Sequence, residues 1–383
     1  MTDTSSQTDN IFAFLLALAI AIPAFLGQDQ TMKPVFYALV VVPALAMILA
    51  RKIHLIALFK DYPYVFLLTV PMLYWSTATL WSDNPENFSG FLRRSLTTFV
   101  FVIAVAHTVA THRQGLVRYL DLALFLVAIA ASIKLGSIFF DDTSSKNWRL
   151  GNESVFNRPL HAAHYFGCFA TYALVRAYQQ ANSRRWMIYA LALAPCALYV
   201  LMTYSRGPLI SYVLVFLVIS IFWYKKPVHA LLALGLSAGV SYQQLDVLTQ
   251  RGASFRDEIW QKSLELIQNN FWLGVGNGTP LDMPYGENKM APHAHNLFLD
   301  MFTRSGIIGF LLVTIIAVFV LWRAYRARPN EQLAIATLLF FFLAMMTDVQ
   351  KLITSPSGGY VVFWLPLTAL LVLSSRPATK GKR

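Results

Sequence analysis

Residues 307–322 read IIGFLLVTIIAVFVLW and contain no charged side chain. Residues 209–222 read LISYVLVFLVISIF and are equally free of charge. A helix needs about 20 mostly apolar residues to cross the ~30 Å hydrocarbon core of a bilayer. Similar runs recur along the chain, and we expect about twelve transmembrane helices, at 11–27, 35–50, 64–81, 95–112, 119–140, 161–180, 186–203, 208–224, 228–242, 296–322, 331–347 and 360–374.

The composition of the 383-residue chain agrees with this interpretation. Apolar residues make up 56% and charged residues 13%, whereas soluble proteins contain about 25% charged residues. So few charges cannot cover the surface of a soluble protein. We therefore expect an all-α polytopic membrane protein in which residues 1–383 form a single integral membrane domain. A soluble enzyme, a DNA-binding module and a disulfide scaffold are excluded.

The positions of the basic residues along the chain explain why its net charge is +12. Short loops on one side of the expected bundle are cationic, whereas loops on the other side, such as 28–34 and 82–94, mix signs or are nearly neutral. Cytoplasmic loops carry an excess of Lys and Arg, so we expect both termini in the cytoplasm and no nucleic-acid partner. The cationic residues are Arg51, Lys52, Lys60, Arg113, Arg118, Arg184, Arg185, Lys225, Lys226, Arg323, Arg326 and Arg328, with Arg376, Lys380, Lys382 and Arg383 in the tail.

Cysteines and the N-terminal residues narrow the interpretation further. Cys168 and Cys196 both fall within expected spans, so the chain has no disulfide or zinc spacing. The first ten residues are polar and lack a basic region, so we expect no cleaved signal peptide.

The longest connection, residues 243–295, is expected on the outer side between spans nine and ten. Its segment 254–268, SFRDEIWQKSLELIQ, has apolar or small residues at helical spacing and predicts an amphipathic helix. We expect this helix to pack its apolar side on the bundle or on the lipid interface. The expected apolar face consists of Ile259, Trp260, Ser263, Leu264 and Ile267.

The second half of this loop contains many glycines and prolines. Gly274-Val-Gly-Asn-Gly278 resembles a phosphate-cradling turn, but it lacks the preceding strand and the following Lys-Ser/Thr of that motif. We interpret it as a flexible turn whose backbone N–H groups are available to an anion. Pro280, Pro284 and Gly286 predict irregular chain as far as Pro292.

Charged residues and histidines gather where the expected outer loops meet the spans. A charge at the edge of the bilayer is costly unless it faces a polar cavity or a partner, so such residues mark functional sites. Arg206 is followed by Gly207-Pro208, a tight turn that would hold its guanidinium at one depth. The set consists of Arg93, Arg94, Arg206, Arg251, Arg256, His293, His295, Arg304, Asp348 and Lys351.

Simpler structural roles remain open for several of these residues. Arg93 and Arg94 can snorkel to lipid headgroups at a span end. Arg256 can be a solvated residue on the polar face of its helix. Arg304 can pair with Asp300, which lies four residues earlier on a helix.

Four outer-side histidines leave a metal site open as an alternative. His161 and His164 are three residues apart and share a helix face, and His293 and His295 close the long loop. Four imidazoles are a possible ligand set for zinc. No cysteine or clustered carboxylate accompanies them, so we favour a site without metal or cofactor.

Arginines on the outer side point to an anionic ligand. Guanidinium groups bind phosphate oxygens in a bidentate way and stay charged when partly buried. ATP and nucleotide sugars remain in the cytoplasm, so an activated donor outside it is a lipid pyrophosphate. Arg206 and Arg256 can stabilise the departing diphosphate, and a histidine can act as base for an attacking sugar hydroxyl. This combination predicts glycan transfer from a lipid pyrophosphate.

Three segments carry a resemblance to a known family. Residues 295–309, HNLFLDMFTRSGIIG, resemble the H-N-x9-G-x-x-G signature of bacterial O-antigen ligases. Residues 203–210, TYSRGPLI, resemble the Ser-Arg-Gly turn of the wider O-antigen ligase and polymerase superfamily. Residues 255–278 resemble its Arg-x3-Trp loop with Gly-x-Gly-x-Gly, and Arg256 stands four residues before Trp260. The twelve-span layout extends the similarity to the whole chain.

The resemblance implies a metal-independent, inverting glycosyltransferase of the polytopic GT-C type in the bacterial inner membrane. Its donor would be O-antigen on undecaprenyl pyrophosphate, and its acceptor an outer-core sugar of lipid A-core lipopolysaccharide at the periplasmic face. By position, His295 resembles the catalytic base, and Arg206 and Arg256 resemble the pyrophosphate-binding arginines. Asp348 resembles an acidic residue of the family. Supporting positions are Arg251, which competes with Arg256, and His293, Arg93, Arg94, His161 and His164.

Other functions remain as alternatives. O-antigen polymerase uses the same donor, and the H-N-x9-G-x-x-G run favours the ligase. A protein O-oligosaccharyltransferase shares the superfamily features, but the modest length of the chain counts against it. A transporter or flippase would have ionisable residues deep in several spans, whereas only Lys134 is expected to be deep here.

Overall fold

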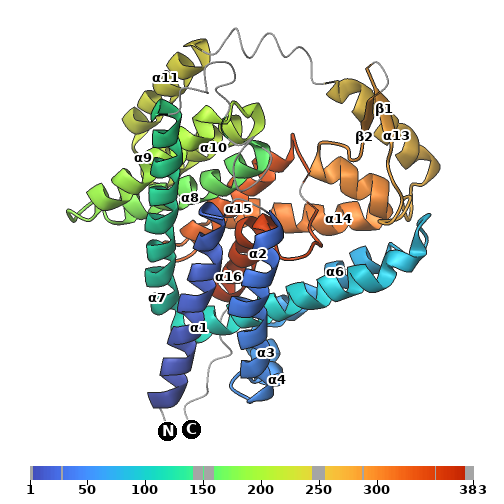
Figure 1. Cartoon of the computed structure of the whole chain (residues 1–383), viewed down its shortest axis with the longest axis horizontal. Helices are drawn as coiled ribbons and strands as arrows, with labels where there is room; N and C mark the ends of the chain where they lie inside the picture. Colours follow the sequence, from blue (N-terminus) through green and yellow to red (C-terminus); the bar gives the residue numbers. More distant parts are fainter. Residues whose placement is uncertain are drawn as a thin grey trace.

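The computed structural model describes residues 3–26, 29–140, 150, 159–243, 255–286, 289–349 and 351–375. The described chain is helical almost throughout, and Figure 1 shows the helices packed around one another with a small hairpin at one edge. A polytopic, mostly helical membrane protein is therefore confirmed.

Helices occupy all twelve of the expected spans. In chain order they are α1 (Asp3–Ala21) with η1 (Ile22–Ala24), α2 (Asp29–Phe36), η2 (Tyr37–Val41), α3 (Val42–Leu49), α4 (Leu55–Asp61), α5 (Pro63–Leu67), α6 (Thr69–Thr77), η3 (Pro85–Asn87), α7 (Phe88–Phe140), α8 (Pro159–Gln179), α9 (Trp186–Met202), α10 (Arg206–Val218), η5 (Ile219–Trp223), α11 (Pro227–Gln243), α13 (Arg256–Asn269), α14 (Leu297–Tyr325), α15 (Gln332–Met345), η6 (Tyr360–Trp364) and α16 (Leu365–Ser374).

The number of membrane crossings stays a prediction. Among the described residues, four helical segments are long and apolar enough to cross a bilayer, namely Gln7–Ala24, Pro85–Ser137, Arg206–Trp223 and Leu297–Tyr325. Leu55–Asp61 and Pro63–Thr77 meet that criterion only together, with a bend of 104° between them. Shorter apolar helices are Lys33–Leu49, Trp186–Met202, Gln332–Met345 and Tyr360–Ser374.

Two expected spans, 95–112 and 119–140, belong to the single helical run α7. At about 1.5 Å per residue a straight helix of 53 residues would greatly exceed the bilayer core. The run is instead bent at His112, whose backbone leaves the helical region (φ −135°, ψ 37°). A Cβ on Gly115 would lie 1.9 Å from Nε2 of His112, so a larger residue there would displace the His112 ring. Figure 1 shows the two arms of α7 running in different directions.

The segment before α14 folds into α13 and a two-stranded antiparallel hairpin. Strands β1 (Met283–Tyr285) and β2 (Lys289–Ala291) pair with Met283 opposite Ala291, and both lie beside α13 in Figure 1. The expected irregular chain up to Pro292 was therefore wrong. Pro284 is compatible with β1 because a two-stranded sheet has only edge strands, on which proline is tolerated.

The buried face of α13 is narrower than we expected. Ile259, Ser263 and Ile267 are buried, whereas Trp260 and Leu264 are 36% and 52% exposed. Ile259 packs in a small core with Leu281, Met283, Ala291 and Ala294, which belong to the hairpin and the segments beside it, and the Ser263 hydroxyl donates to Sδ of Met283. This side of α13 therefore packs on its own loop.

The glycine turn 274–278 is packed into the bundle, and our expectation of a flexible turn with free N–H groups was wrong. The N–H groups of residues 274–277 donate to carbonyls of residues 270, 303, 304 and 78 at 2.9–3.0 Å. Gly274 and Gly306 have φ of +70° and +62°, and a Cβ on Gly274 would lie 2.5 Å from the Gly306 nitrogen. The turn joins α6 to α14 and fixes the position of the α14 N-terminus.

Candidate functional site

His295 is positioned by the residue that follows it. Asn296 is the N-cap of α14, and its side-chain oxygen accepts hydrogen bonds from the N–H groups of Phe298 (3.0 Å) and Leu299 (3.1 Å). Its Nδ2 donates to the carbonyl of Met346 at 3.0 Å. His295 itself has a left-handed backbone (φ 50°). The His-Asn pair thus joins the start of α14 to the end of α15.

The turn that carries His295 is also stabilised by an ion pair on α14. The backbone N–H of Ala294 donates to Oδ1 of Asp300 (3.2 Å), and Nε of Arg304 donates to Oδ2 of the same carboxylate (3.1 Å). Arg304 also donates to the carbonyls of Thr279 and Pro292. The pairing of Arg304 with Asp300 is therefore confirmed, and Arg304 fixes the turn.

Trp260 links α13 to the same turn. Its Nε1 donates to the carbonyl of Ala294 at 2.9 Å. Arg256 lies one helical turn before Trp260, so this hydrogen bond holds the Arg256 end of α13 next to His295. The Arg-x3-Trp spacing thus has a physical explanation in the orientation of α13.

Asp348 lies between two histidines just beyond the end of α15. Its side chain is buried, with Oδ1 3.9 Å from Nδ1 of His295 and Oδ2 3.8 Å from Nδ1 of His164. These distances are longer than hydrogen bonds and place the carboxylate within ion-pair range of both rings. The rings of His293 and His295 are 4.1 Å apart in an edge-to-face arrangement.

Arg206 is brought to the same place by the packing of α10 on the end of α15. A Cβ on Gly207 would lie 2.0 Å from Oγ1 of Thr347, so only glycine allows this approach. Burial lowers the pKa of Arg256, with Asp348 raising it and Arg206 lowering it further. Arg256 therefore interacts electrostatically with both Arg206 and Asp348.

The cations also act on His295. Burial, and then His293 and Arg256, lower the pKa of His295 to about 4, while Asp300 opposes the shift. At neutral pH the imidazole is uncharged and able to accept a proton. The site therefore combines a neutral base with two cations and one buried carboxylate.

A second cationic cluster adjoins this site. Burial, then Arg304 and Arg94, lower the pKa of Lys351, while Asp300 raises it. Arg94 also lies over the ring of Phe91, 5.2 Å from its centroid. Asp300, Arg304 and Lys351 line a small cavity of about 30 Å³ together with Trp75, Phe91, Asn277, Met301, Leu352 and Ile353.

The other expected site residues are less closely associated. Arg93 and His161 are exposed, so His161 does not share the buried environment of His164. Arg251 lies outside the described residues. Within the described residues, no group of three or more His, Cys, Asp or Glu side chains is placed to hold a metal ion. The alternative of a four-histidine metal site therefore gains no support.

Two contacts of the site were not predicted from the sequence. His164 was expected only as a supporting residue, and its contact with Asp348 depends on how α8 packs against α15. Lys351 was expected as a charge at a span end, and its interaction with Arg94 and Arg304 joins residues far apart in the sequence. Spacing along the chain carries no signal for either contact.

Comparison with known proteins supports the family resemblance. A family model described as O-antigen ligase matches residues 191–314. An O-antigen ligase of Pseudomonas aeruginosa is 26% identical over 362 residues, which cover 91% of this chain and 87% of the relative. A ComP-specific O-oligosaccharyltransferase of Acinetobacter baylyi is 24% identical over 273 residues, which cover 63% of this chain and 47% of the relative. No solved structure matches the chain.

The resemblance to O-antigen ligases is thereby confirmed. The matched family region contains Arg206, Arg256 and His295, whereas Asp348 lies beyond its end. Both relatives support a glycosyltransferase-type enzyme embedded in a membrane.

Proposed function

We propose that this relative of the O-antigen ligases transfers O-antigen polysaccharide from undecaprenyl pyrophosphate to an outer-core sugar of lipid A-core. The reaction would take place at the periplasmic face of the bacterial inner membrane, in a multi-pass protein with cytoplasmic termini. The proposal depends on one observation. A neutral histidine, His295, lies close to two arginines and a buried carboxylate at the start of α14.

In this proposal His295 takes the proton of the acceptor hydroxyl. The oxygen forms a bond to the anomeric carbon, the bond from that carbon to the pyrophosphate oxygen breaks, and the configuration inverts. The imidazolium that forms is stabilised by Asp348, whose carboxylate lies 3.9 Å away. His164 on the other carboxylate oxygen would hold Asp348 in this orientation.

Arg206 and Arg256 would take the negative charge that develops on the leaving diphosphate. Two guanidinium groups near one carboxylate leave an excess of positive charge, which a diphosphate can offset without a divalent ion. Binding the diphosphate would also weaken the effect of Arg256 on His295. The proposal therefore links donor binding to the basicity of the catalytic histidine.

The second cationic cluster suits a second anionic group. Among the described residues, Asp300 is the carboxylate that raises the pKa of Lys351, and Asp300 already pairs with Arg304. We assign this cluster to a negatively charged substituent of the acceptor. Surrounding membrane lipids would hold the hydrocarbon tails of both substrates.

His295→Ala in a deletion strain tests the proposal. We expect normal expression, loss of long chains from lipopolysaccharide on a gel, and accumulation of lipid-linked polymer, because the acceptor hydroxyl has lost its base. His54→Ala is a matched control, since that histidine is exposed at the N-cap of α4 and makes no side-chain capping hydrogen bond, and it should restore ligation. Full capping of the core in His295→Ala would contradict the assignment.

The same gel separates the alternatives. In the strain lacking this protein, core bearing a single repeat unit would indicate an O-antigen polymerase. A flippase would leave the lipid-linked glycan on the cytoplasmic side of the membrane. Loss of all long chains, with the polymer accumulating on its lipid carrier in the periplasm, is expected for the ligase.

A further inference from the structure

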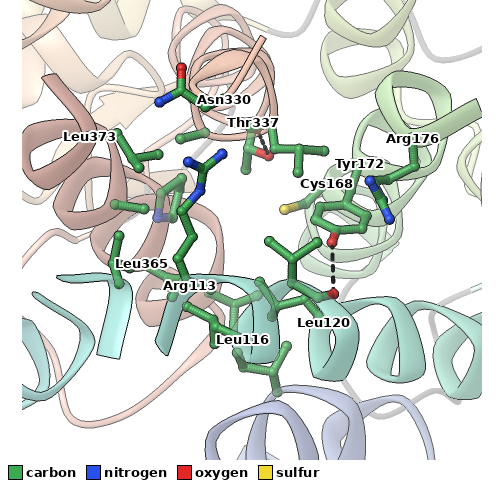
Figure 2. Close-up of a pocket in the computed structure, with 18 of the residues that line it drawn as sticks. Arg113, Leu116, Leu120, Cys168, Tyr172, Arg176, Asn330, Thr337, Leu365 and Leu373 are labelled. Atoms are coloured by element: carbon green, nitrogen blue, oxygen red, sulfur yellow. Dashed lines mark hydrogen bonds between the residues drawn. The ribbon is translucent and has the colours of Figure 1, made fainter. Parts of the chain in front are cut away.

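A second cavity lies within the helical bundle, separate from the site around His295. Its volume is about 170 Å³, and it is bordered by the second arm of α7, by α8, by α15 and by α16. Figure 2 shows Leu116 and Leu120 on one side, Leu365 and Leu373 on another, and Arg113 reaching toward Asn330. Most of the lining side chains are apolar.

This cavity extends from the middle of α8 to its end. Cys168 lines it one helical turn after His164, and Arg176 and Gln179 line it near the end of the helix. Arg176 lies about 18 Å further along α8 than His164. The Arg176 end of the cavity is therefore far from Asp348, and neither His164, His295 nor Asp348 lines the cavity.

The two arginines that line the cavity differ in their partners. Arg176 is neutralised by Asp121 through Nη2 at 2.6 Å and Nε at 2.9 Å, and it also donates to the hydroxyl of Tyr189. Arg113 makes no ion pair or side-chain hydrogen bond within the described residues. Its positive charge is therefore available at the border of an apolar cavity.

An amphiphile matches this combination better than a water-soluble anion. An apolar cavity of about 150 Å³ takes a benzene-sized ligand and excludes water, so the space here suits one segment of a hydrocarbon chain. A guanidinium forms charge-assisted hydrogen bonds with phosphate. Arg113 also belongs to a loop that the charge pattern assigns to the cytoplasmic side.

We propose that this cavity binds one acyl chain of an anionic phospholipid of the cytoplasmic leaflet, with the phosphate on Arg113. The chain would pack among the apolar side chains of α7, α15 and α16, and the second chain would stay in the bilayer. Arg113 directly follows the bend of α7 at His112, and its side chain lines the cavity. This proposal does not rest on the glycan-transfer activity.

Lipid binding to the purified full-length protein tests the proposal. Phosphatidylglycerol and phosphatidylcholine with the same acyl chains are added in detergent, and bound lipid is counted by native mass spectrometry. We expect phosphatidylglycerol to bind about tenfold more tightly than phosphatidylcholine, because its net negative charge is attracted to the guanidinium of Arg113. A tenfold difference in affinity corresponds to about 1.4 kcal/mol. Arg113→Gln should remove this preference. Leu120→Trp should reduce binding of both lipids by filling the cavity.

Arg118→Gln is the matched control, since it removes one positive charge five residues further along the same helix and does not line the cavity. It should keep the preference for phosphatidylglycerol. Equal binding of the two lipids to the unchanged protein would overturn the proposal, as would a preference that survives Arg113→Gln. Tighter binding of a polyprenyl phosphate than of phosphatidylglycerol would also overturn it, and would identify a lipid carrier as the occupant.

Discussion

At the scale of single residues, the charge around His295 decides when it can act as a base. Burial and the neighbouring His293 and Arg256 disfavour the imidazolium, which places the pKa of His295 at about 4. Activity that needs the neutral imidazole is then present above that pH and is lost as the pH falls through it. The acid limb of kcat/KM reports this pKa in the free enzyme.

Arg256→Gln should move the acid limb to higher pH. A positive neighbour disfavours protonation, so its removal raises the pKa of His295 toward the ordinary value of 6.5. Ligation rates at limiting substrate, measured across the acid range, test this shift, while the overall rate should fall because the diphosphate loses one guanidinium. Lys262→Gln removes a charge from the exposed face of the same helix and should leave the limb in place. An acid limb at the same or a lower pH in Arg256→Gln would contradict the interaction of Arg256 with His295.

Asp348→Asn should lower kcat by about 100-fold or more. The amide keeps the shape of the side chain but cannot stabilise the imidazolium at His295, as seen when an orienting carboxylate is neutralised in hydrolytic triads. KM should change less, because Asp348 is buried. Asp83→Asn, at an exposed position on the outer side, is the control and should keep full turnover. Unchanged kcat in Asp348→Asn would assign Asp348 a packing role.

The residues of this site were predictable to different degrees. His295, Arg206 and Arg256 stand in recognisable local patterns, since the cap at Asn296 and the tight turn at Gly207-Pro208 are encoded by neighbouring residues. Asp348 was expected at a span end and by its resemblance to an acidic residue of the family, without a local pattern around it. The contact of His164 with Asp348 depends on packing between helices separated by more than 150 residues in the sequence, which spacing does not encode.

At the scale of elements, runs of apolar residues predicted the positions of the helices but not the folding of residues 255–295. Long charge-free runs become helices because every backbone polar group must be paired inside a bilayer. The loop has no such constraint. Its hairpin and the buried face of α13 depend on a small local core around Met283 and Ala294. Trp260 stays partly exposed, while its Nε1 donates to the carbonyl of Ala294.

Gly306→Ala should destabilise the junction between the glycine turn and α14. Gly306 has φ of +62°, and a Cβ there would lie 2.2 Å from the carbonyl oxygen of Trp272, a backbone atom that cannot move aside easily. The backbone strain alone amounts to about 1–3 kcal/mol. Thermal unfolding in detergent should show a clearly lower Tm, together with reduced ligation because the His295 turn shifts.

Gly90→Ala is the matched control for this substitution. A Cβ at Gly90, near the start of α7, meets nothing within 4 Å, and alanine favours the helix over glycine. Its Tm should stay the same or rise. If Gly306→Ala unfolds at the same temperature as Gly90→Ala, the close packing of the two glycine segments does not hold in the membrane.

At the scale of the whole molecule, the bundle separates two environments. His164, Arg206 and His295 lie near the starts of α8, α10 and α14, whereas Arg113 lines the cavity that reaches the opposite end of α8 and the start of α15. The charge pattern assigns these two ends to opposite sides of the membrane. Glycan transfer at the periplasmic face requires this assignment.

Two serine-to-cysteine substitutions test the orientation directly. Ser89 is exposed at the start of α7, at the end of the bundle that carries His295, and Ser183 is exposed in the turn between α8 and α9. A membrane-impermeant maleimide should label Ser89→Cys on cells whose outer membrane alone is opened, and Ser183→Cys only after the inner membrane is broken. The native Cys168 and Cys196 are buried among the helices, so they contribute little background. Labelling of Ser183→Cys before the inner membrane is broken would place the basic loops outside, and the diphosphate site would then face the cytoplasm.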